Sequence, residues 1–411
     1  MESSDRDFDV IVWGATGFTG RLVAEYLALT YGVGRQLRWA IAGRSADKLA
    51  SIASMVSESQ AEELPQLLAD INNPDSIDQL VQKTRVICTA VGPYALYGSV
   101  MVEACVKHGT HCCDLTGETP WMRKMIDQHQ TAAESSGAKI VHTCGFDSIP
   151  SDIGVYFLQQ CMREKYLAEA AEIKYRVVSS AGGVSGGTVA SMMNMMDEAK
   201  TDKSIFETLQ DPYALNPLNQ PRGPDGNDQM GTVYDHDFRQ WSGPFMMAGI
   251  NTRVVRRSNA LLNYSYGREF RYSEAILTGS GPGGYMRALL VALGTGLMGL
   301  LAALGPTRAL LKKMLPAPGE GPSEQARNMG HFNIELLGKH ALDESKNIRI
   351  SVTGDKDPGY GATSKMLAES AVCLAMDSLT EGGGFLTPAS AMGDQLVKRL
   401  QQKAGMGFHI I

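Results

Sequence analysis

The sequence predicts an α/β protein in which a doubly wound parallel sheet is joined to a second, α+β domain with a mixed or antiparallel sheet. Two observations carry this prediction. Six short apolar stretches alternate with helical patterns over residues 7–144, as in successive βαβ units. The chain also has 411 residues, more than one domain usually holds, so a second domain is expected.

The first apolar stretch, residues 7–13, runs into a glycine-rich turn and then a helical pattern. The turn consists of Gly14, Ala15, Thr16, Gly17, Phe18, Thr19 and Gly20. In such a unit the first glycine permits a tight turn, the second lets a pyrophosphate approach, and the third lets the helix pack closely. The N-terminus of the helix directs free N–H groups toward the phosphates. We predict that these seven residues bind a dinucleotide.

The end of the second stretch, residues 37–44, indicates which dinucleotide is bound. Sites that prefer NAD(H) usually have an acidic residue here, which holds the ribose 2′-hydroxyl. This chain instead has Arg44, followed one helical turn later by Lys48. Both side chains favour a 2′-phosphate, so we predict NADP(H) rather than NAD(H) as the cofactor. In the alternative interpretation, both residues are solvated at the start of a helix.

The third and fourth stretches, residues 66–72 and 85–91, add further cofactor contacts. Asp70 lies at the end of the third stretch, where it can reach the adenine edge. The fourth stretch runs into Gly92 and Pro93, at the sheet edge where cofactor and substrate meet in open α/β folds. The cofactor contacts predicted in this region are Asp70, Val91, Gly92, Pro93 and Tyr94.

Residues 110–116 and 139–144 complete a Rossmann-type sheet. Side chains that can ligate metals gather around the first of these stretches: His108, His111, Cys112, Cys113 and Asp114. Adjacent residues of a strand point to opposite faces, and the spacing matches no common zinc pattern. We therefore predict buried thiols and no metal site.

Composition narrows the class of function and the location. A formal charge of −6 provides no basic surface for nucleic acid. The chain has seven cysteines, an odd number, and its N-terminus is acidic and polar, unlike a targeting peptide. These features predict reduced thiols and a cytoplasmic location.

Several motifs together resemble those of one family. They are the glycine-rich turn, AGR at residues 42–44, CDLTGE at 113–118 and GFDSIPSD at 145–152, with further matches at 359–365 and 382–388. The set resembles the saccharopine dehydrogenase-like oxidoreductases, in particular the branch that includes trans-acting enoyl reductases. The resemblance implies a nicotinamide-dependent oxidoreductase in three parts: a cofactor-binding domain at residues 1–150, a substrate domain at 151–355, and C-terminal helices at 356–411 that pack back on the first domain.

Residues 151–355 contain the least informative patterns. Residues 172–179 alternate as a half-exposed strand does, and residues 331–337 and 346–353 predict two antiparallel strands. Residues 201–250 are rich in Asn, Asp, Pro and Gly, which predicts a long, partly irregular excursion. Ser185 matches the G-x-S-x-G pattern of hydrolases, but a glycine loop that faces a carbonyl or anionic group fits better beside a dinucleotide fold.

Reduction by hydride transfer needs a proton donor near the nicotinamide. None of the 14 tyrosines is followed by Lys four residues later, so the catalytic pair of short-chain reductases is absent from the sequence. The catalytic candidates are Tyr94, Asp147 and Ser148, with Asp114 nearby. In the alternative interpretation, Tyr94 only packs, and Asp147, Ser148 and Asp152 cap the next helix.

Residues 288–305 form an uncharged stretch of eighteen residues, at the lower limit for a bilayer span. A spanning helix would place residues 356–411 on the wrong side of the membrane. We therefore favour a helix that lies on a membrane or lipid surface, or covers a lipid-substrate pocket, which adds peripheral lipid association to the cytoplasmic location. The alternatives are a buried hairpin and a homodimer interface.

The leading hypothesis is an NADP(H)-dependent reductase of the enoyl type, acting on a lipid-like or polyketide-derived acyl substrate. A second hypothesis is a saccharopine-type dehydrogenase, whose amino-acid imine carries carboxylates and needs converging cations. The second domain offers several arginines, although their spacing equally suits the solvated face of strands: Arg253, Arg256, Arg257, Arg268 and Arg271. A third hypothesis is a non-catalytic NADP-binding protein at a lipid surface.

Overall fold

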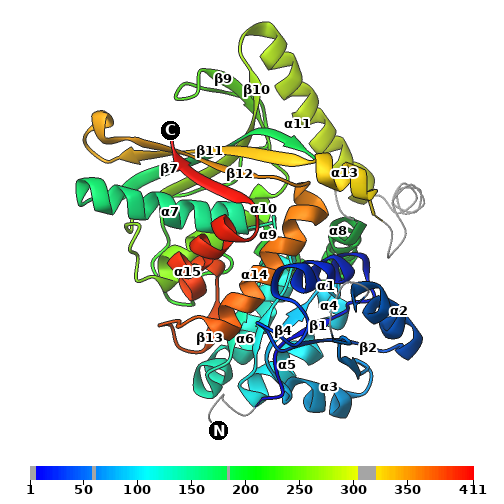
Figure 1. Cartoon of the computed structure of the whole chain (residues 1–411). Coiled ribbons are helices and arrows are strands. Elements are labelled where there is room, and N and C mark those ends of the chain that lie inside the picture. Colours follow the sequence, from blue (N-terminus) through cyan, green and yellow to red (C-terminus); the bar gives the residue numbers. More distant parts are fainter. Residues whose placement is uncertain (1–5, 58–61, 183–185, 304–320) are drawn as a thin grey trace.

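The computed structural model describes residues 6–57, 62–182, 186–303 and 321–411. Two seven-stranded sheets form the molecule, and helices lie between them (Figure 1). The strand order is β13-β6-β5-β4-β1-β2-β3 in the first sheet and β14-β12-β11-β7-β10-β9-β8 in the second. This architecture confirms the predicted fold class.

The first sheet is parallel throughout. Its strands are β1 (Phe8–Trp13), β2 (Trp39–Gly43), β3 (Gln66–Leu68), β4 (Thr84–Thr89), β5 (His111–Cys113), β6 (Lys139–Val141) and β13 (Gly384–Leu386). The sequence predicted the first six. The seventh, β13, was missed because it has three residues directly after three glycines, a composition that indicates a loop. Chain order reverses between β1 and β4, which makes this pair the switch point where such sheets bind ligands.

Helices cover both faces of this sheet. They are α1 (Phe18–Tyr31), α2 (Ala46–Ser57), α3 (Pro74–Val81), α4 (Tyr94–Tyr97), α5 (Ser99–His108) and α6 (Thr119–Ser136). The α5 and α6 helices each end at a left-handed glycine, Gly109 and Gly137. Cys112 packs in the apolar cluster of α3, α5 and α6, whereas Cys113 packs in the cluster of α1 and α2. The two thiols therefore lie on opposite faces of the sheet, as predicted.

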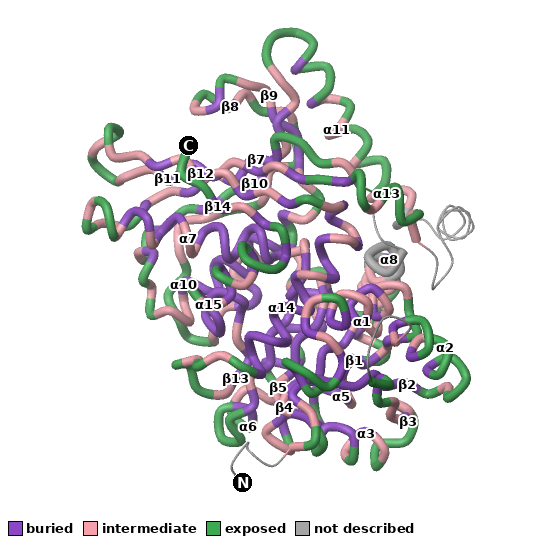
Figure 2. The backbone as a smooth tube through the Cα atoms, in the orientation of Figure 1, coloured by how far each residue is buried: buried purple, intermediate pink, exposed green. Residues whose placement is uncertain are grey.

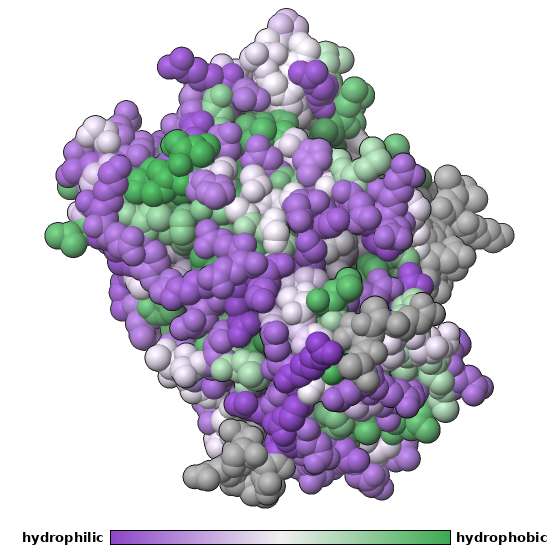
Figure 3. Space-filling model, viewed as in Figure 1, coloured by the Kyte–Doolittle hydropathy of each residue, from purple (hydrophilic) through white to green (hydrophobic). Residues whose placement is uncertain are grey.

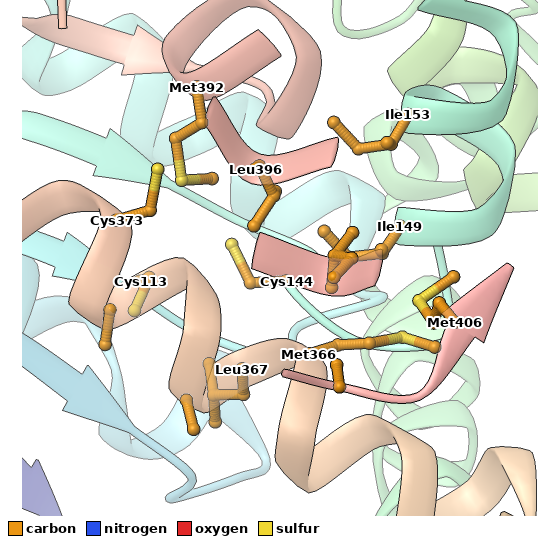
Figure 4. Close-up of a cluster of buried hydrophobic side chains, with 14 of the residues drawn as sticks. Cys113, Cys144, Ile149, Ile153, Met366, Leu367, Cys373, Met392, Leu396 and Met406 are labelled. Carbon is orange, nitrogen blue, oxygen red and sulfur yellow. The ribbon is translucent and has the colours of Figure 1, made fainter. Parts of the chain in front are cut away.

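Three helices from outside the first 148 residues join the two sheets: α7 (Ile149–Tyr166), α14 (Thr363–Met376) and α15 (Pro388–Gln402). The α14 helix packs on α1, β1, β4 and β5, and α15 packs on α7 and α14. Their side chains form one continuous apolar core, seen in Figure 4 around Cys144, Ile149 and Leu367. Figure 2 shows α14 as an almost fully buried helix at the centre of the molecule.

The second sheet is mixed, because β7 and β10 are parallel and the other neighbours are antiparallel. Its strands are β7 (Ala170–Ala181), β8 (Val233–Asp235), β9 (Gln240–Gly243), β10 (Arg271–Gly279), β11 (His331–His340), β12 (Ile348–Gly354) and β14 (Met406–Ile410). The antiparallel pairing of β11 with β12 confirms the two late strands expected there. The remaining helices are α8 (Gly186–Thr201), α9 (Lys203–Gln210), α10 (Ala248–Leu261), α11 (Gly281–Ala303) and α13 (Glu324–Met329), with short turns at Glu344–Lys346 and Pro358–Ala362.

Residues 201–250 form a long, partly irregular excursion, as the sequence predicts. They contain α9, β8, β9 and the start of α10, and the stretches between these elements form neither helix nor strand. Arg253, Arg256 and Arg257 do not lie on solvated strand faces, because they are buried on α10. The helix carries three arginines, a residue type that is rarely fully buried, so nothing in the local sequence indicated that it packs inside the protein. The Ser185 hypothesis falls outside the described residues.

Candidate cofactor and active site

The glycine-rich turn follows β1 and wraps closely around the first turn of α1. Gly14 has a φ of +85°, and the N–H of Gly17 donates to the Gly14 carbonyl oxygen at 2.9 Å. A Cβ atom on Gly20 would lie 2.2 Å from that same oxygen, so only glycine fits where the helix crosses the turn. The helix has no side-chain cap at Gly17 and no acidic residue in its first turn. Its first N–H groups are therefore available for a phosphate.

Arg44 and Lys48 flank the end of β2, as the spacing predicts. Both side chains are exposed, and within the described part of the chain neither forms a hydrogen bond or an ion pair. Two unpaired cations beside a phosphate-binding turn fit the 2′-phosphate of NADP(H). Asp70 is less free, because its Oδ1 accepts hydrogen bonds from the backbone and side-chain nitrogens of Asn72.

Phe18 connects the glycine-rich turn to the C-terminal part of the chain. Its ring contacts Tyr360 with the centroids 4.7 Å apart, and the guanidinium groups of Arg21 and Arg327 lie 5.5 and 5.3 Å from its centroid. The side chain therefore faces protein, while the backbone of Phe18 begins α1. Local patterns could not predict the contacts with Tyr360 and Arg327, because both residues lie more than 300 positions from Phe18.

Tyr94 follows Val91, Gly92 and Pro93 at the end of β4, and the Gly92–Pro93 peptide bond is cis. Its hydroxyl donates to the Thr89 carbonyl oxygen at 3.2 Å and accepts from the Leu115 N–H at 3.1 Å. Burial raises the pKa of Tyr94 well above its ordinary value. We conclude that Tyr94 joins the ends of β4 and β5, a role that argues against its use as the proton donor.

Glu118 holds this loop in place and received no role from the sequence. Its buried carboxylate accepts from the backbone N–H groups of Tyr94 and Ala95, both at 2.8 Å, and from the Ser191 hydroxyl at 2.6 Å. It thereby caps the N-terminus of α4 and anchors α8 over the end of the first sheet. Desolvation raises its pKa. The only sequence signal was an acidic residue five positions after the end of the fifth strand.

Asp114 and Ser148 are buried and occupied by structural contacts. Asp114 lies 2.6 Å from the Nδ1 atom of His142 and also accepts from the Thr116 N–H. The Ser148 hydroxyl donates to the Oδ1 atom of Asn251 on α10, 3.1 Å away. Both groups therefore join neighbouring elements and do not face open space.

The expected capping of α7 was wrong. Ser148 is the N-cap residue of this helix, but its side chain makes no capping hydrogen bond. Asp152 accepts from the Ser258 hydroxyl and from the Ala389 N–H at the start of α15. Burial raises the pKa of Asp152 to about 7. These polar groups join α7 to other helices, because tertiary partners compete with the local backbone for them.

Asp147 differs from the other candidates. It is half-buried, and within the described residues it forms no hydrogen bond or ion pair. Desolvation raises the pKa of its carboxyl to about 7. A Cβ atom on Gly117 would lie 3.7 Å from its Oδ2, so this carboxyl sits beside the ends of β5 and β6, at the edge where Rossmann-type sheets bind ligands. A partly accessible carboxyl with this pKa can give or take a proton near neutral pH.

Behind Ser148, a buried polar chain leads into the second sheet. The Nδ2 atom of Asn251 donates to Glu274 at 2.9 Å, and the Tyr272 hydroxyl donates to the same carboxyl at 2.6 Å. Burial raises the pKa of Glu274 to about 7. The folded protein therefore holds this proton at pH values where the unfolded chain has lost it.

This shift predicts how stability depends on pH. Between about pH 4.5 and pH 7 the folded state binds more protons than the unfolded state, so stability falls as the pH rises. Replacing Glu274 by Gln should remove this contribution and flatten the decline by about 2 kcal/mol. Urea unfolding of the native protein and of Glu274→Gln at pH 5 and pH 8 measures the change in the free energy of unfolding. Parallel declines in the two proteins would show that Glu274 is not protonated in the native state.

The fold and this site together define a dinucleotide-binding oxidoreductase. The model of the saccharopine dehydrogenase NADP-binding domain matches residues 10–141. A Mycobacterium tuberculosis protein provisionally named a trans-acting enoyl reductase is 40% identical over 419 residues, which cover 97% of each chain. The chain belongs to the saccharopine dehydrogenase-like oxidoreductases, in the branch of the trans-acting enoyl reductases, and its cofactor is NADP(H).

Two further comparisons agree. The trans-acting enoyl reductase of Mycobacterium bovis is 37% identical over 420 residues, again 97% of each chain. The apo form of saccharopine dehydrogenase (L-Glu forming) from Saccharomyces cerevisiae has a TM-score of 0.52 at 11% identity, and the match covers 98% of this chain and 99% of that one. The second likeness shows the fold alone.

Proposed function

We propose that this protein reduces a carbon–carbon double bond conjugated to the carbonyl group of a lipid-like or polyketide-derived acyl substrate. NADPH supplies a hydride when it is bound, and the carbon next to the carbonyl group must then receive a proton. Asp147 is the group that we assign to this protonation, because it alone among the candidates combines a raised pKa, partial exposure and an unoccupied carboxyl. That combination is the observation on which the proposal rests.

The surroundings of this site favour an apolar substrate. The Ser191–Glu118 hydrogen bond seats α8 beside the loop at Gly92. The sequence of α8 contains four methionines, at positions 192, 193, 195 and 196. Methionine side chains adapt to irregular apolar ligands. The names of the relatives point to enoyl reduction as well.

The arginines of α10 argue against a saccharopine-type substrate. Arg253 pairs with Asp228, and Arg256 pairs with Asp225 at 2.9 Å. Arg257 donates to the carbonyl oxygens of Leu215 and Phe385. All three guanidinium groups are buried and already engaged, so they are not available to bind the carboxylates of an amino-acid imine.

The proposal is tested by NADPH oxidation with a panel of enoyl thioesters and a panel of amino-acid imines. We expect turnover with the thioesters of longer acyl chains. Turnover with imines alone would support the saccharopine-type reaction instead. Tight NADPH binding without turnover in either panel would support a non-catalytic binding protein.

The preference for NADPH is expected to depend on Arg44. Replacing Arg44 by Asp should weaken NADPH binding about 10- to 100-fold and leave NADH binding within about twofold, because the 2′-phosphate then meets a carboxylate. Fluorescence titration with both nucleotides measures this. The matched control is Arg35→Asp, an exposed arginine at the opposite end of β2. Equal losses for the two nucleotides would show that Arg44 does not contact the 2′-phosphate.

A further inference from the structure

The α11 helix exposes a large apolar surface. Among the described residues it is the one helix that is long and apolar enough to cross a membrane: its window Gly281–Leu301 has a mean hydropathy of 1.5, and only 11% of it is buried. The exposed large side chains are Tyr285, Met286, Leu290, Leu293, Leu297, Met298 and Leu300. Figure 3 shows hydrophobic atoms gathered at the upper right of the molecule, where α11 lies in Figure 1. The buried-hairpin alternative is therefore excluded.

The α11 helix packs against the second sheet through a narrow stripe of small residues. Gly284 and Ala288 are the only buried residues of α11 whose side chains are described. A Cβ atom on Gly243 of β9 would lie 3.1 Å from the Cβ atom of Val291, so the helix approaches β9 closely. The protein body thus covers one side of α11 and leaves the other sides open (Figure 2).

The topology is incompatible with a single bilayer crossing by α11. The strand before α11 is β10, and the next strand after it is β11. Both pair directly with β7 in the same sheet, so these two strands lie on one side of any membrane, and one crossing by α11 cannot connect them. The helix is about 35 Å long at 1.5 Å per residue, and it contacts β9, β10 and α8, which favours an orientation along a surface.

The distribution of the exposed side chains distinguishes lipid from a second copy of the chain. At 100° per residue, positions 285, 290 and 298 point in directions that span more than half of the circumference. A helical partner would cover a stripe of about 100° and leave the remaining leucines and methionines in water. Acyl chains surround a half-immersed helix on every open side, so they match this distribution better.

We propose that α11 embeds in one leaflet of a phospholipid bilayer, with its axis in the membrane plane and the rest of the protein on the surface. Charge attraction contributes little, because residues 288–303 carry no charge and the whole chain has a formal charge of −6. Binding therefore rests on burial of apolar side chains. This attachment is independent of the reaction proposed above.

The test is flotation of the full chain with phosphatidylcholine vesicles. We expect the native protein to float, and the variant L293E/L297E to show at least a tenfold lower partition coefficient. The matched control is L167E/L342E, which makes the same change at two leucines that are each 93% exposed and lie outside α11. All three proteins should bind NADPH equally, since the substituted positions are on the surface.

Three results would overturn the proposal. The native protein could remain with the vesicle-free fraction, or L293E/L297E could float as well as the native protein. The third result would be a native dimer, seen by light scattering, that becomes a monomer in L293E/L297E. A second copy of the chain would then cover the exposed surface of α11. A loss of turnover without a change in flotation would contradict the proposed reaction but not the proposed membrane attachment.

Discussion

Replacing Asp147 by Asn is expected to lower kcat for acyl reduction by about 10²- to 10⁴-fold, the range usual for the loss of a positioned general acid. The amide has nearly the same shape, so NADPH binding and the melting temperature should change little. In the native protein the carboxyl donates its proton only while protonated. With a pKa of about 7, kcat should therefore be highest below pH 7 and fall above it.

The pH profile separates chemistry from structure in this experiment. The weak residual activity of Asp147→Asn should lose the decline above pH 7. Asp152→Asn is the control, because Asp152 also has a pKa of about 7 but is fully buried between α7, α10 and α15. That variant should unfold more easily and keep the native pH profile. If the pH profile of kcat in Asp147→Asn is the same as in the native protein, another group or water must donate the proton.

Gly20→Ala should abolish NADPH binding and destabilise the fold by about 3 kcal/mol. The added methyl group would meet the Gly14 carbonyl oxygen at 2.2 Å, the Gly14 carbonyl carbon at 2.7 Å and the Cα atom of Ala15 at 2.9 Å. All three are backbone atoms, so relief requires that α1 move away from the turn. Urea unfolding and NADPH titration measure the two effects.

Gly294→Ala is the control for Gly20→Ala. Gly294 also lies within a helix, but an added Cβ atom there meets no other atom within 4 Å. The change should be neutral, or stabilise the protein by about 0.5–1 kcal/mol, because alanine restricts the unfolded chain. Native stability and NADPH affinity in Gly20→Ala would mean that α1 does not pack against the turn as described.

Local patterns were sufficient for six strands of the first sheet and for its cofactor. Gly14, Gly17 and Gly20 lie within one turn, and Arg44 follows the next strand directly, so their chemistry depends on neighbours in the sequence. The family resemblance added the reaction class. Neither the local patterns nor the family resemblance required knowledge of contacts between residues distant in the sequence.

The roles of the polar residues near the active site could not be read in the same way. Asp152 contacts Ala389, and Ser148 contacts Asn251, at separations of more than 100 residues. Single-sequence patterns report helix caps but not such partners. The burial of Arg256 was equally invisible, because its carboxylate partner, Asp225, comes from a stretch that indicated only a loop.

The C-terminal elements have a consequence for synthesis of the protein. Strand β13 completes the first sheet, β14 completes the second, and α14 covers the inner face of β1 and β4. A ribosome releases the nucleotide-binding motifs first, and one apolar face of their sheet stays uncovered until residues 363–376 have emerged. A premature stop before residue 386 leaves both sheets unfinished. The sheet that carries the glycine-rich turn therefore depends on a helix and a strand that are synthesised more than 340 residues after the turn itself.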